Sequence, residues 1–184
     1  MTPSRYDDEL WELVPEEPGV PPQHLREFVR SLGHVERALD LGCGDARLTL
    51  ELDAGELTAA DVSAVALARA GRRLPDGARL AELEPDAPLP FADGAFDLVL
   101  STETIEHVRD VQLFLSEIRR VLRPGGELAL STPANFAVGR RDHPLSPHLR
   151  LFTRRSLRTL LGELGFEVAW LRRRSGSLLA RARR

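Results

Sequence analysis

A short apolar run that ends in a carboxylate and two closely spaced glycines constrains this chain most. The run ends at Asp40-Leu41, and Gly42 and Gly44 follow it directly. An apolar segment that enters a helical pattern through such a turn is typical of the first strand and helix of a parallel α/β sheet. We therefore expect a strand over 37–41, a helix over 46–52 and a ligand site at the turn between them.

The charges beside this turn favour a cationic ligand. Asp40 precedes the first glycine, Asp45 follows the second, and Arg47 stands where a dinucleotide-binding fingerprint has its third glycine. Two carboxylates repel the pyrophosphate of a dinucleotide and attract an amino group. The turn is therefore predicted to hold a nucleoside that carries an ammonium group.

Length and composition indicate a single domain. The chain has 184 residues, and none of its apolar runs approaches the ~18 residues that cross a bilayer, so we expect no membrane association. Cys43 is the one cysteine, which excludes an intrachain disulfide and favours a cytoplasmic location. We expect residues 1–184 to form one domain, with an acidic, proline-rich extension over 1–22 that is either flexible or folded over the cleft.

Strand and helix signals alternate along the rest of the chain. Apolar residues recur at helical spacing in some segments and form short continuous runs in others. Together with 37–41, the strands would form a seven-stranded, mostly parallel sheet in a doubly wound α/β fold, with a C-terminal antiparallel hairpin. The further strands are expected over 57–62, 78–83, 96–101, 127–132, 166–171 and 177–182, and the further helices over 22–32, 63–71, 111–122 and 153–165.

The glycine turn resembles the first motif of the class I S-adenosylmethionine-dependent methyltransferases, acid-x-Gly-x-Gly-x-Gly. Asp40, Gly42 and Gly44 match the motif, and Ala46 replaces its third glycine. The resemblance covers roughly residues 20–184 and implies a Rossmann-like fold, S-adenosylmethionine as cofactor and methyl transfer as the activity. Further segments that resemble family motifs, in the family's order, are 60–63, 89–99 and 121–128.

The same resemblance implies roles for the residues around the cofactor. Asp40 would help to hold its methionine end, and Asp61, followed by Val62, would accept hydrogen bonds from the ribose hydroxyls. An acid after the third strand would read the adenine, with Glu84 favoured over Asp86. The cofactor residues expected are Asp40, Gly42, Gly44, Asp61, Val62, Glu84 and Ser101, the last of which would border the sulfonium with Thr102.

A second group of polar residues follows the predicted strand over 96–101. If a helix begins near Glu103, then Glu103, Glu106 and His107 share one face, and His148 lies on an irregular segment expected to overhang the same edge. Two acids and two histidines suit a divalent metal of intermediate hardness. The alternative is that the acid–histidine pair orders the chain or acts as a general base without a metal.

This Glu-x-x-Glu-His pattern with a downstream histidine resembles two groups of metal-dependent methyltransferases. They are the ubiquinone-pathway O-methyltransferases and the small-RNA 3′-end ribose 2′-O-methyltransferases. The resemblance implies Glu106, His107 and His148 as catalytic residues, and these three with Glu103 as ligands of a divalent metal that would lower the pKa of the attacked hydroxyl.

Three functions follow from these patterns. The favoured one is O-methylation of a small molecule by in-line methyl transfer, although a nitrogen or carbon nucleophile also fits. The second is methylation of RNA, because residues 140–184 hold 12 arginines against three acids. The third is a non-catalytic, cofactor-binding partner subunit. The short segments around the cleft also predict an open site, or one completed by a partner chain as in a homodimer.

Overall fold

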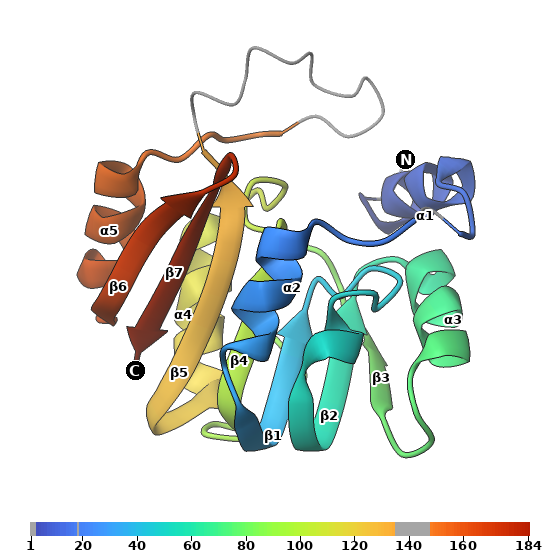
Figure 1. Ribbon diagram of the computed structural model, residues 1–184, viewed down its shortest axis with the longest axis horizontal. Helices are drawn as coiled ribbons and strands as arrows, with labels where there is room; N and C mark the ends of the chain where they lie inside the picture. The colour runs from blue at the N-terminus through green and yellow to red at the C-terminus, as the bar shows by residue number, and fades with distance from the viewer. Residues whose placement is uncertain (1–2, 18, 135–147) are drawn as a thin grey trace.

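Seven strands form one sheet in the order β3-β2-β1-β4-β5-β7-β6 (Figure 1). The computed structural model describes residues 3–17, 19–134 and 148–184. Strands β1 to β5 pair in parallel, and β7 is antiparallel to both of its neighbours. The strands are β1 (His34–Leu41), β2 (Asp53–Asp61), β3 (Arg79–Glu82), β4 (Phe96–Thr102), β5 (Leu122–Pro133), β6 (Glu167–Arg174) and β7 (Ser177–Arg183).

This architecture confirms the predicted doubly wound α/β fold with a seven-stranded, mostly parallel sheet. The C-terminal hairpin is closed by Ser175 and Gly176, whose φ values of 47° and 95° both lie in the left-handed region. A two-residue turn with positive φ at both positions matches the natural twist of the strands that it joins. The hairpin is therefore encoded locally, by a residue pair that tolerates this backbone.

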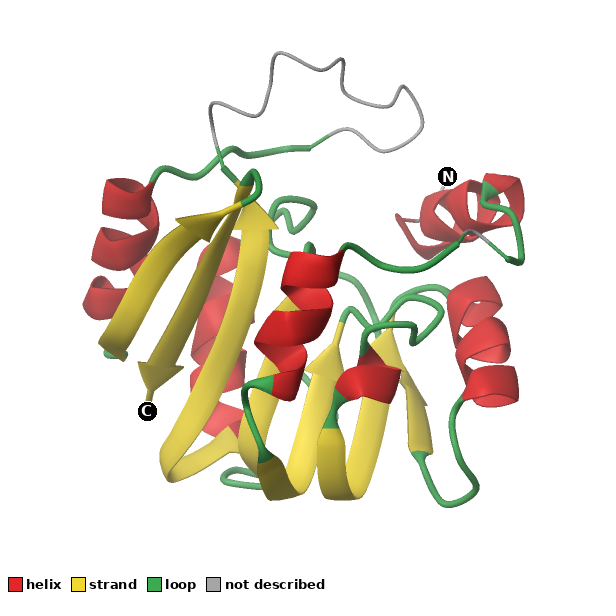
Figure 2. Cartoon of the chain, in the orientation of Figure 1, coloured by secondary structure: helices red, strands yellow, loops and turns green. Residues whose placement is uncertain are grey.

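Helices cover both faces of the sheet (Figure 2). One face packs against α4 and α5 in the larger apolar cluster, and the other packs against α2. A buried helix stripe on each face removes both sides of the central strands from water, as their continuous apolar sequence requires. The helices are α1 (Pro3–Leu13), α2 (Gln23–Arg30), α3 (Ala64–Arg73), α4 (Val111–Val121) and α5 (Arg154–Glu163).

The helix expected over 46–52 is wrong. The structure has only a 3₁₀ turn, η1 (Thr49–Glu51), because Ala46 takes a φ of 64° and β2 already begins at Asp53. A left-handed residue breaks an α-helix, and too few residues remain before the strand for a new one. The link between β1 and β2 is therefore an irregular loop that lies close to the glycine turn.

The N-terminal extension contains a helix that its proline-rich sequence did not indicate. Helix α1 lies above the carboxyl ends of the strands on the β1–β3 side of the sheet, next to α3 (Figure 1). No helix of the described residues is long and apolar enough to cross a membrane. The carboxyl edge of the sheet is thus covered by chain from the N-terminus.

The packing of α2 generates a stability prediction. Phe28 is 3% exposed and makes an edge-to-face contact with Trp170, with ring centroids 5.9 Å apart. We expect Phe28→Ala to lower the free energy of unfolding by about 3–5 kcal/mol, measured by urea denaturation, because it leaves a cavity under α2. Leu50→Ala is the control, since Leu50 is 51% exposed and its loss should cost less than about 0.5 kcal/mol. Equal effects of the two variants would contradict this account.

Candidate active site

The candidate site lies where the carboxyl ends of β1 and β4 meet. These strands are neighbours in the sheet, but the chain leaves them toward opposite sides, which makes this point the topological switch of the fold. Ligands of open α/β sheets bind in the crevice at such a switch. Thr104, just after β4, donates a hydrogen bond to the main-chain oxygen of Gly42 over 3.4 Å, so the two strand ends are in direct contact.

The glycine turn needs its two glycines for steric as well as conformational reasons. Gly42 and Gly44 have φ values of 77° and 55°. A Cβ atom on Gly42 would lie 2.4 Å from Cγ2 of Thr104, and one on Gly44 would lie 2.7 Å from Cζ2 of Trp11. Sequence reasoning assigned both glycines to the approach of a ligand, whereas in the structure protein side chains already lie against them.

Asp40 is completely buried beneath this turn. One carboxylate oxygen, Oδ2, accepts a hydrogen bond from Thr49 Oγ1 at 2.6 Å, and the other, Oδ1, has no partner among the described residues. Burial raises the pKa of Asp40 to about 7, Thr49 acts against the rise, and the charge of Asp61 adds to it. Asp40 is therefore a buried acceptor that a cationic donor would stabilise in its ionised form.

Asp61, at the end of β2, holds the glycine turn to the second strand. Its oxygens accept hydrogen bonds from the main-chain N–H groups of Gly44 at 2.8 Å and Ser63 at 3.0 Å. Burial raises its pKa, and these hydrogen bonds oppose the rise. Val62 is half-buried and packs against the core beside it. Carboxylate oxygens accept more than one hydrogen bond each, so these contacts leave capacity for ribose hydroxyls.

Three buried side-chain oxygens of the described residues have no hydrogen-bond partner, and all three belong to predicted site residues. They are Asp40 Oδ1, Ser101 Oγ and Glu106 Oε1. An unsatisfied buried polar atom costs about 1–3 kcal/mol, so such atoms are rare outside functional sites. They lie at the end of β1, in β4 and just after β4, so the carboxyl ends of the two neighbouring strands carry acceptors that a ligand with hydrogen-bond donors could satisfy.

The flanking acid Asp45 does not contribute the negative charge expected from the sequence. Its carboxylate pairs with Arg47 at 2.9 Å and with Arg73 at 2.8 Å, and it is almost fully buried. Two guanidinium groups offset one carboxylate, so Asp45 cannot repel a phosphate or attract an amine. The acidity of the crevice depends on Asp40 and Asp61 instead.

The adenine-reading acid is not fixed by contacts. Glu84 is exposed and follows β3, whereas Asp86 has a φ of 56° and accepts a weak hydrogen bond from Asp110 N at 3.4 Å. Asp86 also lines a cleft of about 660 Å³ with Arg109 and Arg150. The structure thus gives neither acid a contact with the glycine turn, and Glu84 stays a prediction.

The polar group after β4 forms a turn and not the helix expected from Glu103. Glu103 has a φ of 51°, and its Oε1 accepts a hydrogen bond from Ser131 Oγ at 2.7 Å, which directs the side chain to β5. The turn brings Glu106, His107 and His148 together instead, with ligand atoms all within 4.8 Å of one another. Glu103 lies outside this cluster.

His148 reaches the cluster because its segment docks on the turn. The N–H of Leu149 donates to the main-chain oxygen of Glu106 at 2.9 Å, and the rings of His107 and His148 have centroids 5.1 Å apart. Nε2 of His107 lies 3.9 Å from Oε1 of Glu106. One carboxylate and two imidazoles at this spacing fit a single divalent ion, after small side-chain movements.

Glu106 is the buried acid of the cluster. It is 1% exposed, Thr132 Oγ1 donates to its Oε2 at 2.9 Å, and its Oε1 has no hydrogen-bond partner within the described part of the chain. Burial, followed by the charge of Glu103, raises its pKa to about 8. A carboxyl group with a pKa near neutrality can accept or release a proton under physiological conditions.

The arginines of the last third of the chain are partly accounted for by internal contacts. Arg150 donates to the main-chain oxygens of Val108 and Arg109, and Arg181 pairs with Glu127. Further arginines pair with Glu27 or bind main-chain oxygens at the end of α4. These contacts favour a structural role for the basic residues over a nucleic-acid surface.

Comparisons with known proteins agree with the geometry. Residues 39–130, half of the chain, match the family described as the methyltransferase domain. A probable S-adenosylmethionine-dependent methyltransferase from Mycolicibacterium smegmatis is 41% identical over 143 residues, which cover 71% of this chain and 51% of that protein. An O-methyltransferase from Penicillium expansum is 30% identical over 151 residues, which cover 72% of this chain and 52% of that protein.

The fold is also shared with solved structures. A SAM-dependent methyltransferase from Aquifex aeolicus superposes with a TM-score of 0.74 at 18% identity, over 95% of this chain and 96% of that one. At this identity the likeness concerns the fold alone. The chain spans about half the length of the two curated relatives described above.

The burial of Asp40 predicts a characteristic pH dependence. Its pKa is raised to about 7 in the folded chain and is near 4 when unfolded, so the folded state holds an extra proton between these values. The stability of the ligand-free protein should therefore fall as pH rises from about 4 to about 7, by up to about 1.4 kcal/mol per pH unit from this group.

Asp40→Asn should remove this contribution, because its amide mimics the protonated carboxyl and does not titrate. We expect urea denaturation at several pH values to show a flatter profile for the variant and higher stability than the wild type at pH 8. Parallel profiles for the two proteins would contradict the assignment.

Proposed function

Because the chain belongs to the methyltransferase domain family, we propose that it transfers a methyl group from S-adenosylmethionine to a hydroxyl group of a small molecule. The observation that carries the proposal is that three buried oxygens without a hydrogen-bond partner among the described residues belong to side chains at or just beyond the carboxyl ends of β1 and β4. The similarity to an O-methyltransferase supports oxygen as the acceptor atom. A cleft of about 660 Å³ beside the site has the size of a small-molecule pocket.

The cofactor would lie along the ends of β1, β2 and β4. Asp40 would accept a hydrogen bond from the amino group of the cofactor. The positive charge of that group would stabilise the ionised carboxylate, whose pKa burial raises. Asp61 would accept hydrogen bonds from the ribose hydroxyls. The hydroxyl of Ser101, which has no hydrogen-bond partner among the described residues, would lie beside the sulfonium. Each of these donors or acceptors is placed by a strand end, so the site is built on the rigid part of the fold.

The chemistry requires alignment and the removal of one proton. When bound, S-adenosylmethionine supplies an electrophilic methyl carbon; the acceptor oxygen bonds to it as the carbon–sulfur bond breaks, and the sulfur keeps the electron pair. Holding the partners in line can supply about 7–11 kcal/mol of the barrier. Glu106, or His107 whose Nε2 lies 3.9 Å from it, would take the hydroxyl proton.

A divalent metal is the alternative aid to deprotonation. Glu106, His107 and His148 would hold it. Oε1 of Glu106, which has no hydrogen-bond partner among the described residues, could serve as a metal ligand. A bound metal would lower the pKa of the substrate hydroxyl. In either case the carboxylate of Glu106 would have the central role, and Glu103 would act on it only through its charge.

Binding of S-adenosylhomocysteine, followed by calorimetry, tests the cofactor assignment. We expect the wild type to bind and Asp61→Ala to bind at least about tenfold more weakly, because the ribose hydroxyls lose their acceptor. Asp61→Asn is the second variant, because its amide oxygen can still accept the hydrogen bond from Gly44 N. It therefore separates the loss of cofactor contacts from a disrupted glycine turn. Unchanged affinity in both variants would refute the ribose assignment.

Methylation assays test the catalytic group with a matched pair of variants. We expect Glu106→Gln to lower kcat at least about 100-fold with cofactor affinity nearly unchanged, and Glu103→Gln to stay within about threefold of the wild type. A chelator separates the two mechanisms: loss of activity that is restored by added metal favours the metal, and no effect favours the general base. Full activity of Glu106→Gln would exclude both.

A further inference from the structure

The N-terminal strap, defined as residues 7–17 and 19, lies over the glycine turn. It comprises most of α1 and the segment that follows, and α1 packs against α3 (Figure 1). Asp8 fixes its first turn, because its Oδ1 accepts hydrogen bonds from Ser63 Oγ at 2.7 Å and from Val65 N at 3.2 Å. Those groups begin α3, so the strap is attached directly beside the end of β2.

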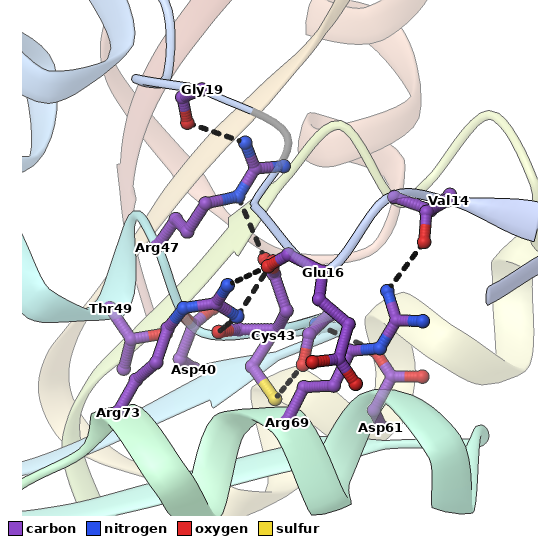
Figure 3. A network of polar contacts seen from close by, with 12 residues as sticks. Val14, Glu16, Gly19, Asp40, Cys43, Arg47, Thr49, Asp61, Arg69 and Arg73 are labelled. Carbon is purple, nitrogen blue, oxygen red and sulfur yellow. Dashed lines mark hydrogen bonds and ion pairs between the residues drawn. The ribbon is translucent and has the colours of Figure 1, made fainter. Parts of the chain in front are cut away.

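Three arginines hold the rest of the strap through its main chain (Figure 3). They come from the loop after the glycine turn and from α3, and each donates to a carbonyl oxygen of the strap. Arg69 is 7% exposed, so this attachment is largely shielded from water. The donor and acceptor pairs are Arg47 with Gly19, Arg69 with Val14 and Arg73 with Glu16.

Trp11 is the side chain that the strap places on the glycine turn. Its ring lies in the space that a Cβ atom of Gly44 would enter, with Cζ2 2.7 Å from that position. The guanidinium of Arg69 lies 5.9 Å from the ring centroid on the α3 side. The ring is therefore fixed between a backbone that a ligand is expected to approach and a cation that positions it.

Asp7, next to Asp8 in α1, lies near charged groups that follow two different strands. The carboxylate of Asp7 is half-buried. The charges of Asp61, at the end of β2, and of Arg109, in the segment after β4, both act on it. Burial, Asp61 and Asp8 raise its pKa to about 6, while Arg109 lowers it. An acid held near two others is stabilised when a cation or a hydroxyl donor enters between them.

We propose that the strap forms the outer wall of the cofactor site, with Trp11 as a cofactor-contacting residue, and that it opens to let the cofactor enter and leave. This inference rests on the proposed function, because it places the adenosyl cofactor against the glycine turn. A wall over the cofactor must lie against the glycine turn, and Trp11 of the strap does so at Gly44. Arg69 is a positioning residue, since it acts on Trp11 and on the backbone of the strap.

The chain offers a matched pair of tryptophans for the test. Trp11 and Trp170 are its two tryptophans, and Trp170 packs against Phe28 under α2, on a different part of the molecule. In Trp170→Phe the fluorescence reports on Trp11 alone. We expect saturation with S-adenosylhomocysteine to shift its emission and to reduce its quenching by acrylamide. Unchanged emission and quenching at saturation would overturn the contact.

Calorimetry of the two alanine variants gives a second readout. We expect Trp11→Ala to weaken binding of S-adenosylhomocysteine at least about tenfold and Trp170→Ala to change it less than about twofold. The melting temperature without ligand should show the reverse order, because Trp170 packs in a core cluster. Equal affinities of the two variants, with intact binding by the wild type, would overturn the strap proposal alone. A wild type that binds no S-adenosylhomocysteine would overturn the proposed function with it.

Dissociation kinetics test the opening. Arg69→Met removes both the hydrogen bond to Val14 and the cation beside Trp11, but it keeps the apolar stem in place. We expect it to release S-adenosylhomocysteine at least about fivefold faster in stopped-flow measurements. Arg72→Met on the same helix is the control, since Arg72 contacts the strap through the exposed side chain of Glu16 at 3.2 Å. Equal release rates in the two variants would refute gating by the strap.

Discussion

The burial of a carboxyl group beneath the glycine turn is the constraint on which the rest of the site depends. One oxygen of Asp40 accepts a hydrogen bond from Thr49, the other has no hydrogen-bond partner among residues 3–17, 19–134 and 148–184, and the side chain is wholly removed from water. Its ionised form is therefore unfavourable until a cation arrives. Burial also raises the pKa of Asp61 and of Glu106. A positively charged ligand at the carboxyl edge of the sheet would therefore stabilise the ionised forms of these acids.

The sequence predicted those features that depend on local pattern. Apolar runs and helical spacing indicated all seven strands, and the positive-φ pair at Ser175 and Gly176 was readable as a hairpin turn. The buried oxygens of Asp40, Ser101 and Glu106 belong to residues chosen from motif order. Such residues were identifiable because each lies at or shortly after the end of a strand, and parallel strands bring their carboxyl ends to one edge.

Features that depend on long-range pairing could not be predicted in this way. Asp45 seemed to add negative charge, but Arg73, distant in sequence, offsets it together with Arg47. Glu103 shares helical spacing with Glu106, yet a left-handed backbone sends it toward Ser131. The helix expected over 46–52 failed for the same reason, since the conformation of Ala46 is set by the loop that it enters and not by its own preference.

The three arginines bind the strap through hydrogen bonds to its main-chain carbonyl oxygens, which every residue type carries. Most side chains there can consequently vary while these hydrogen bonds remain. A one-residue insertion or deletion, in contrast, would move every later carbonyl group out of reach of its guanidinium. Selection on this segment should accordingly act on its length more than on its composition, with Trp11 and Asp8 as the exceptions.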